Sequence, residues 1–134
     1  MARVAWATIS TSTYSNTKDQ LVIDNPLSLI KLEAFPSLFT LNLSFSVIEL
    51  NETKKYLMEI EIGEEHGEKI VDANITIDHQ YNPENPLDVF TSDATISNIR
   101  FPHEGLYYVR ITVDNDYHNY KIYFVVRKTG DQDG

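Results

Sequence analysis

Strict alternation of apolar and polar residues is the feature that most constrains how this chain folds. The clearest example spans residues 39–47, where Phe39, Leu41, Leu43, Phe45 and Val47 alternate with Thr40, Asn42, Ser44 and Ser46. Successive side chains of a β-strand point to opposite faces, so this pattern predicts a strand with one buried and one solvated face, as antiparallel sheets have. The phase changes at Val47–Ile48, which predicts a β-bulge or a bend between sheets.

The same two-residue period recurs along most of the chain. Strands are predicted at residues 4–9, 20–24, 26–33, 38–50, 55–62, 70–78, 87–91, 94–101, 107–113 and 120–126, some of them weak. In the first strand Trp6 is expected to be buried. Residues 11–18 are polar and are expected to form a loop, and residues 79–86, with two prolines, are the longest predicted loop.

Because some of these ten segments are weak, we count seven to nine strands. With turn signals about every ten residues and no helix-spaced apolar pattern, they predict an all-β fold. The expected architecture is a two-sheet antiparallel β-sandwich of immunoglobulin-like or Greek-key type. A chain of 134 residues with 42% hydrophobic content has enough apolar material for one packed domain. We expect that domain to span residues 1–127, with a disordered tail at 128–134.

The charge balance narrows the choice of partner. The net charge is −9, so phosphate repulsion disfavours direct binding to nucleic acid and the acidity favours solubility or a basic protein partner. There is no cysteine, no signal-peptide pattern and no apolar run long enough for a membrane span. The chain is therefore expected in the cytoplasm, without a membrane partner.

No enzyme signature is present. The motifs of P-loops, dinucleotide folds, nucleophile elbows and zinc proteases are missing, and the four histidines have no ligand-like spacing. We therefore predict no enzyme activity and no cofactor. Asp114 and Asp116 flank Asn115 in an acidic turn and are weak calcium candidates, although an ordinary hairpin turn explains the same residues.

Tyrosines give the better functional signal. Tyr108, Tyr117 and Tyr123 have outward parity around the last predicted hairpin, and Glu59 and Glu61 share the wet face of another strand. Tyrosine is enriched at protein interfaces, so these five residues are candidate protein-binding residues, with cross-strand packing as the alternative explanation. Edge strands of a sandwich are also open to self-association. The loop tyrosines, Tyr14 and Tyr81, together with Tyr117, are candidates for stacking against a sugar.

Gly105 and Tyr107 resemble the tyrosine corner of immunoglobulin-like sandwiches, in which the hydroxyl returns to a nearby backbone group. Val109 stands where antibody domains have cysteine. More widely, residues 27–36 with Phe35-Pro36, the strand 39–47 and residues 105–126 resemble a family of small bacterial and phage β-sandwich proteins. The chain departs from that family at residues 25–28, Asn-Pro-Leu-Ser, where a glycine-bearing turn is expected. The resemblance implies the fold and carries no activity.

The predicted function is that of a non-enzymatic protein-binding or assembly module. The resemblance and the acidity together favour an accessory protein of a phage or mobile element that binds or inhibits a host factor, in the host cytoplasm if a phage encodes it. The alternatives are a small-molecule or carbohydrate-binding module and a calcium-dependent binding domain. A hydrolase built from distant residues has no support in the sequence.

Overall fold

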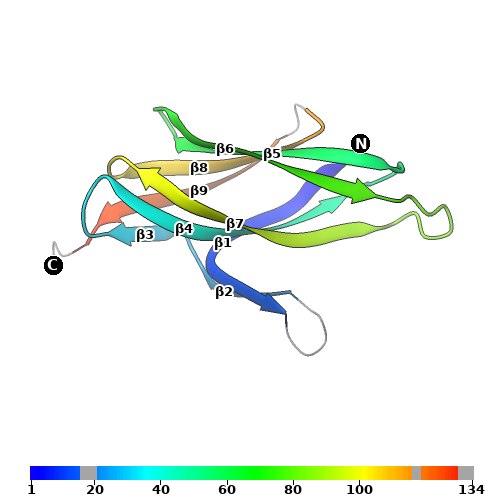
Figure 1. Cartoon of the computed structure of the whole chain (residues 1–134), viewed down its shortest axis with the longest axis horizontal. Coiled ribbons are helices and arrows are strands. Elements are labelled where there is room, and N and C mark those ends of the chain that lie inside the picture. Colours follow the sequence, from blue (N-terminus) through cyan, green and yellow to red (C-terminus); the bar gives the residue numbers. More distant parts are fainter. Residues whose placement is uncertain (16–20, 116–118, 130–134) are drawn as a thin grey trace.

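Nine strands in two facing sheets make up the described part of the chain (Figure 1). The computed structural model describes residues 1–15, 21–115 and 119–129. In chain order the strands are β1 (Arg3–Ser15), β2 (Leu21–Pro26), β3 (Leu29–Leu32), β4 (Ser37–Ile48), β5 (Lys54–Glu64), β6 (Lys69–His79), β7 (Val89–Phe101), β8 (Gly105–Val113) and β9 (Tyr120–Lys128). The two-sheet all-β sandwich predicted from the sequence is confirmed.

The four-stranded sheet has the order β2-β1-β4-β7, and the five-stranded sheet has the order β3-β9-β8-β5-β6. The chain crosses between the sheets after β2, β3, β4, β6 and β7, as Greek-key sandwiches do. The sheets are not wholly antiparallel, because β3 runs parallel to β9, with Leu29 opposite Val125. The short β3 enters the five-stranded sheet at its edge, directly after the crossing from β2.

The core lies between the sheets and consists of the residues with inward parity. Alternation is confirmed in β4, β5, β8 and β9, whose inward side chains are buried or half-buried. Those buried almost completely include Leu41, Leu43, Phe45, Val47, Met58, Ile60, Ile62, Val109, Ile111, Phe124 and Val126. Full burial of one such side chain contributes about 1.5–3 kcal/mol, so this layer is the main favourable contribution to stability.

The predicted tyrosine corner is present. Tyr107, at the start of β8, is fully buried, and its hydroxyl donates a 2.7 Å hydrogen bond to the carbonyl oxygen of His103. The ring of Tyr107 lies edge-on to Phe101, with centroids 5.1 Å apart, and stacks on Phe124 at 5.8 Å. The corner therefore fixes the β7–β8 crossing and one end of the core together.

The first strand differs from the prediction. Trp6 points outward and is 36% exposed, because the β1–β4 register shifts between Val4 and Trp6. The extra residue moves Trp6 to the outer face and places Ala7 and Ile9 in the core. β1 also continues to Ser15, so part of the expected 11–18 loop is strand, paired with β2.

The phase change after Val47 is not a bulge. β4 stays in register with β7 through Ile48 and ends there, and the shift against β1 at this point comes from the extra residue on β1. Glu49 then adopts a left-handed conformation, with φ of 62°, and the chain passes to β5 in the other sheet. The alternative prediction, a bend between sheets, is the one that the structure contains, and Leu50 is buried as a result of it.

The two strands predicted at 87–91 and 94–101 are one strand, β7. The phase change between Ile96 and Ile99, inside the second predicted strand, is a bulge near Asn98, whose φ is 57°, where the register with β4 shifts. The predicted start of the tail, residue 128, is too early. Lys128 belongs to β9, and the backbone N–H of Thr129 donates a hydrogen bond to the carbonyl oxygen of Leu32. The rest of the tail, residues 130–134, lies outside the described residues.

No helix in the described part of the chain is long and apolar enough to cross a membrane.

Replacing Tyr107 with phenylalanine tests the corner. Tyr107→Phe keeps the ring contacts but leaves the carbonyl of His103 without this donor, so we expect a loss of about 1–3 kcal/mol in the free energy of unfolding, measured by urea denaturation. Tyr81→Phe, in the loop between β6 and β7, is the matched control and should change stability by less than about 0.5 kcal/mol. Equal effects of the two variants would contradict a special role for the corner.

Candidate functional site

Tyr108 and Tyr123 lie directly opposite each other on β8 and β9, on the outer face of the five-stranded sheet. Their outward parity is confirmed: Tyr107 and Phe124, their neighbours in the chain, point into the core. Tyr123 is 50% exposed, whereas Tyr108 is half-buried. The two candidate tyrosines therefore share a face but differ in what surrounds them.

Tyr108 is held in place by β5. Gly63 lies directly opposite it, and a Cβ atom at Gly63 would stand only 2.8 Å from the Tyr108 hydroxyl oxygen, so a larger residue there would displace that hydroxyl. The hydroxyl donates to Glu61 Oε2 at 2.6 Å, and Arg110 forms a short ion pair with the same oxygen. Burial raises the pKa of Tyr108, and the hydrogen bond to Glu61 raises it further. These contacts make Tyr108 mainly a structural residue.

Lys121 joins the two tyrosines. Its ammonium group lies 4.5 Å from the ring centroid of Tyr108, 5.2 Å from that of Tyr123 and 3.2 Å from Glu65 Oε1. Hydrogen bonds with Tyr123 and then Glu65 keep the pKa of Lys121 above its ordinary value. Desolvation acts against the charge on Glu65, but the bonds with Lys121 and Tyr123 outweigh it and lower the pKa of Glu65. The charges around the tyrosine pair are thus largely matched.

An apolar patch continues from Tyr123 toward β3. Leu106 and Val125 lie opposite each other next to the tyrosine pair and are 44% and 37% exposed. Leu29 of β3 lies beside Val125 through the parallel pairing and is half-buried. We call Leu29, Leu106, Tyr123 and Val125 the β8–β9 patch. It is a contiguous apolar surface on a rigid sheet.

The edge of this patch is cationic. Lys31 and Arg127 are opposite each other in the β3–β9 register, both are exposed, and neither forms an ion pair within the described residues. The carboxylates of this face lie mainly on β5, on β6 and in the turn between them, whereas Glu104 lies near the rim, where its Oε1 accepts a 2.6 Å hydrogen bond from the backbone N–H of Lys128. A chain with a net charge of −9 therefore carries a locally positive rim beside its apolar patch.

The sequence-predicted site is partly assembled. Tyr108, Tyr123 and Glu61 come together in one network with Arg110 and Lys121, and Glu59 lies two residues from Glu61 on the same face, half-buried. Tyr117 and Asp116 lie outside the described residues. Sequence reasoning did not select Leu106 and Val125. Their outward parity in the last hairpin was the available signal.

Asp114 serves the hairpin turn. Its carboxylate accepts a 2.8 Å hydrogen bond from the backbone N–H of Leu57 and forms a 2.7 Å ion pair with Lys54. Asp114 and Asn115 have φ angles of 52° and 57°, a left-handed conformation that Asp and Asn tolerate. Among the described residues, no group of three or more acidic or histidine side chains is arranged to hold a metal ion.

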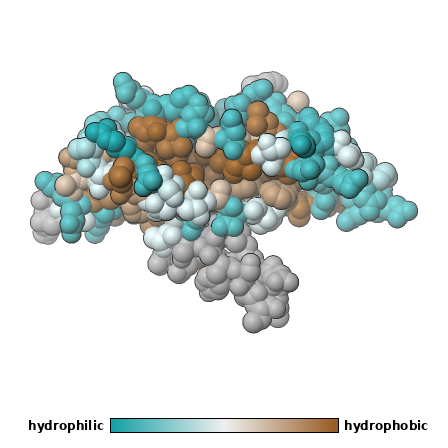
Figure 2. All heavy atoms as spheres, viewed as in Figure 1, coloured by the Kyte–Doolittle hydropathy of each residue, from teal (hydrophilic) through white to brown (hydrophobic). Residues whose placement is uncertain are grey.

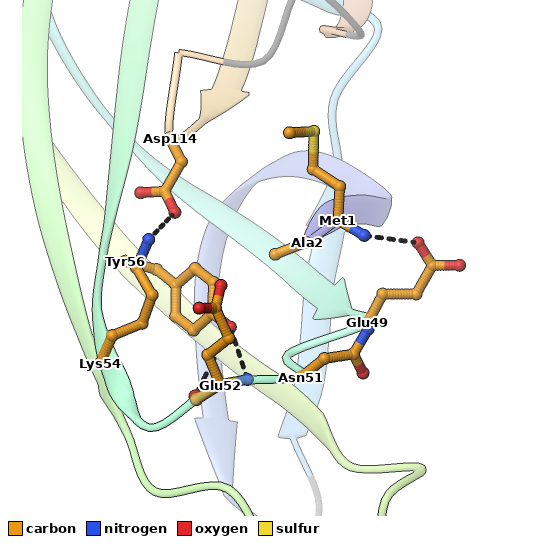
Figure 3. Close-up of a pocket in the computed structure, with 8 residues that line it drawn as sticks. All are labelled: Met1, Ala2, Glu49, Asn51, Glu52, Lys54, Tyr56 and Asp114. Carbon is orange, nitrogen blue, oxygen red and sulfur yellow. Dashed lines mark hydrogen bonds and ion pairs between the residues drawn. The ribbon is translucent and has the colours of Figure 1, made fainter.

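Among the described residues, a cavity lies at each end of the sandwich. The larger, about 300 Å³, is bounded by the start of β1, the β4–β5 connection and Asp114. Figure 3 shows two charge pairs on its wall: Lys54 with Asp114, and Glu49 with the N-terminal ammonium group at 4.0 Å. On the same wall, the hydroxyl oxygen of Tyr56 accepts a hydrogen bond from the backbone N–H of Glu52. These polar groups on the cavity wall are therefore bonded to one another.

The smaller cavity, about 240 Å³, lies beside the tyrosine corner, at the opposite end of β5. His103 Nδ1 lies 3.2 Å from Glu64 Oε2 on its wall, and the histidine is more than half exposed. The buried hydroxyl of Tyr107 is already bonded to the backbone. Among the described residues that line this cavity, no nucleophile is held by a base, and the cavity is a polar recess.

Comparison with known proteins supports the fold. No protein-family model matches the chain, and no curated protein matches its sequence. Among solved structures, the chain is similar to a β-glucosidase from Erythrobacter marinus, with 8% sequence identity and a TM-score of 0.54. The match covers 94% of this chain and 15% of the glucosidase, so this chain spans a small fraction of that protein's length. At this identity the similarity shows a shared fold alone.

The Asp114 contacts predict a pH-dependent stability. Desolvation raises the pKa of Asp114, but the bonds with Lys54 and Leu57 outweigh it and hold the pKa below the ordinary value. A depressed carboxyl pKa stabilises the fold above the unfolded-state value of about 3.9, and this contribution is lost as pH falls through the folded-state pKa. Asp114→Asn should therefore cost about 1 kcal/mol at pH 7 and almost nothing near pH 2.

Urea denaturation at a series of pH values measures this difference. Asp78→Asn, at an exposed position of β6, is the control and should show no pH-dependent gap from the wild type. A gap for Asp114→Asn that is as large at pH 2 as at pH 7 would mean that the carboxylate charge contributes nothing.

Proposed function

We propose that this protein is a non-enzymatic protein-binding module and that the β8–β9 patch is its contact surface. The observation that carries the proposal is the exposure of Leu106, Tyr123 and Val125 side by side on a sheet face. Contiguous exposed apolar patches on soluble proteins often mark interaction sites. Tyr123 adds a large side chain with few rotatable bonds, which loses little entropy on binding.

The local charge favours a partner that presents apolar side chains next to acidic groups. Lys31 and Arg127 would face those acidic groups at the β3 edge of the patch, where charge complementarity would set the orientation of binding. A basic partner, favoured by the net charge of −9, remains the prediction for the acidic surface elsewhere.

The biological setting is a further part of the proposal. The resemblance to small bacterial and phage β-sandwich proteins and the overall acidity support an accessory role in a phage or mobile element, through binding or inhibition of a host factor in the cytoplasm. Binding through a sheet face agrees with such a role, since an inhibitor of this kind needs a rigid surface and no chemistry of its own.

Paired variants test the patch. Wild type, Leu106→Ser and Tyr123→Ala are immobilised and exposed to extract of the source cells, and captured proteins are quantified by mass spectrometry. A protein that depends on the patch is then purified, and its affinity is measured by calorimetry. We expect each patch variant to weaken binding about tenfold or more, as loss of a central apolar contact does. Leu38→Ser, on the other sheet, should stay within about twofold of the wild type.

Two results would contradict the proposal. One is that every captured protein binds the wild type and both patch variants equally well. The other is that Leu38→Ser weakens the purified partner as much as the patch variants do. Thermal unfolding of each variant shows whether the fold is kept, so that loss of binding is assigned to the surface.

Carbohydrate binding is a second candidate, favoured by the outer face of the four-stranded sheet. Trp6 lies there beside Ser46 and Thr91, whose hydroxyls are hydrogen-bonded, and Thr95 bonds to Asn42 in the same way. An exposed indole among hydroxyl and amide groups is the combination that stacks against and hydrogen-bonds a sugar ring. Of the loop tyrosines expected for this role, Tyr81 is half-buried, and the side chains of Tyr14 and Tyr117 lie outside the described residues.

Fluorescence tests the sugar hypothesis directly, because Trp6 is the only tryptophan in the chain. If this candidate is right, a panel of oligosaccharides shifts or quenches the emission with saturation, and Trp6→Ala abolishes the sugar-dependent rise in melting temperature. Calcium at millimolar concentration, added alone, tests the calcium alternative by the same melting assay. Flat fluorescence and unchanged melting with every ligand would remove both alternatives.

A further inference from the structure

β7 is an edge strand without the usual protection. It pairs with β4 on one side and ends the four-stranded sheet on the other. Between Val89 and Ile96 it contains one charged residue, Asp93, and neither lysine, proline nor glycine. Exposed edges are normally blocked by short length, charge, proline or a bulge. The first bulge of β7 comes only near Asn98, so eight regular residues precede it.

The core is incompletely covered on the side of this edge. β6 and β7 are the edge strands of their sheets and lie along the same side of the sandwich (Figure 1). Their inward apolar side chains remain half-buried: Val71 and Ile75 on β6, and Phe90, Ala94 and Ile96 on β7. In the same view, Figure 2 shows a hydrophobic band along the middle of the molecule, between hydrophilic ends. A strand added at β7 would bury part of this surface.

We propose that β7 pairs with β7 of a second copy of this chain, in an antiparallel register centred on Ser92. This register places Val89 opposite Thr95, Phe90 opposite Ala94 and Thr91 opposite Asp93, on both sides of a two-fold axis. The strand is regular throughout these residues. The largest inward side chain then faces a small one, and each charged residue faces a threonine.

The neighbouring registers fit less well. In an antiparallel pair, opposite residues point to the same face of the sheet. The two-fold axis must therefore pass through a residue position, and the next registers are centred one residue along the strand. A centre at Thr91 pairs Val89 with Asp93, an apolar side chain with a carboxylate. A centre at Asp93 sets two carboxylates against each other, which is destabilising. A centre at Ala94 carries the pairing into the bulge at Asn98, where the ladder is disrupted.

A second copy is favoured over an unrelated strand because the edge is complementary to itself. A two-fold axis uses the same surface twice, so the uncovered apolar side chains of each copy face those of the other. The pairing continues the four-stranded sheet across the dimer. It leaves the β8–β9 patch free, since that patch is on the outer face of the other sheet. The dimer would therefore present two binding faces and gain avidity toward a multivalent partner.

Charge variants at two matched positions test the register. Thr91 and Thr95 flank Asp93 at equal distance on the same face, so a new charge at either has a similar effect within one chain. Only Thr91 faces Asp93 of the other copy when the axis passes through Ser92. Sedimentation equilibrium of the full chain measures the dimer dissociation constant of the wild type, Thr91→Asp, Thr91→Lys and Thr95→Asp.

We expect the wild type to show a reversible monomer–dimer equilibrium. Thr91→Asp should weaken the dimer about tenfold, because the repulsion occurs twice, and Thr91→Lys should bind at least as tightly as the wild type. Both effects should shrink in 1 M salt. Thr95→Asp should stay within about threefold of the wild type. Both Thr91 variants lose the same bond to Ser46, so the opposite signs of their effects report on charge.

A wild type that stays monomeric at about 1 mM overturns the dimer. A strong loss for Thr95→Asp with none for Thr91→Asp overturns the register. Leu106→Ser, the patch variant, should leave the dissociation constant unchanged. Loss of the dimer in Leu106→Ser would place self-association on the five-stranded sheet and overturn the β7 pairing. If the dimer forms but no partner is captured, only the proposed function is contradicted.

Discussion

The packing of Tyr107 against Phe101 and Phe124 is the interaction on which the rest of the structure depends. Phe101 ends the edge strand of one sheet, while Tyr107 and Phe124 belong to adjacent strands of the other, so the three rings join the sheets. The hydroxyl of Tyr107 also holds the crossing that leads from β7 to β8. β8 lies between β9 and β5, and its placement therefore sets the position of both neighbours.

This inward packing determines what the outer face presents. With Tyr107 and Phe124 fixed inside, Leu106, Tyr123 and Val125 must point outward, and the pairing of β8 with β9 brings them together. Toward β5 the same face becomes polar, where Glu61 accepts bonds from Tyr108 and Arg110. One half of the sheet surface is thus closed by internal pairing, and the other half keeps its apolar groups available.

Sequence periodicity predicted the strands whose alternation is unbroken and missed the features created by pairing. β4, β5, β8 and β9 were predicted with the correct buried faces because each residue's parity is a local property. Trp6 was placed inside because the bulge near Val4 shifts the phase without any signal in residue type. The phase change inside the strand predicted at 94–101 has the same kind of cause, the bulge at Asn98. The apolar patch depends on β3 lying beside β9, and strand order is not encoded in alternation.

The parallel pairing of β3 and β9 has a consequence for how the molecule is made. Leu29 finds its partner only when Val125 has been synthesised, so β3 emerges from the ribosome long before the strand that it joins. Such long-range closures carry a large loop entropy and form late, which slows the folding of sandwiches. The nascent chain must carry Ile30 and Leu32 unburied through most of translation, a period in which chaperone capture competes with misassociation.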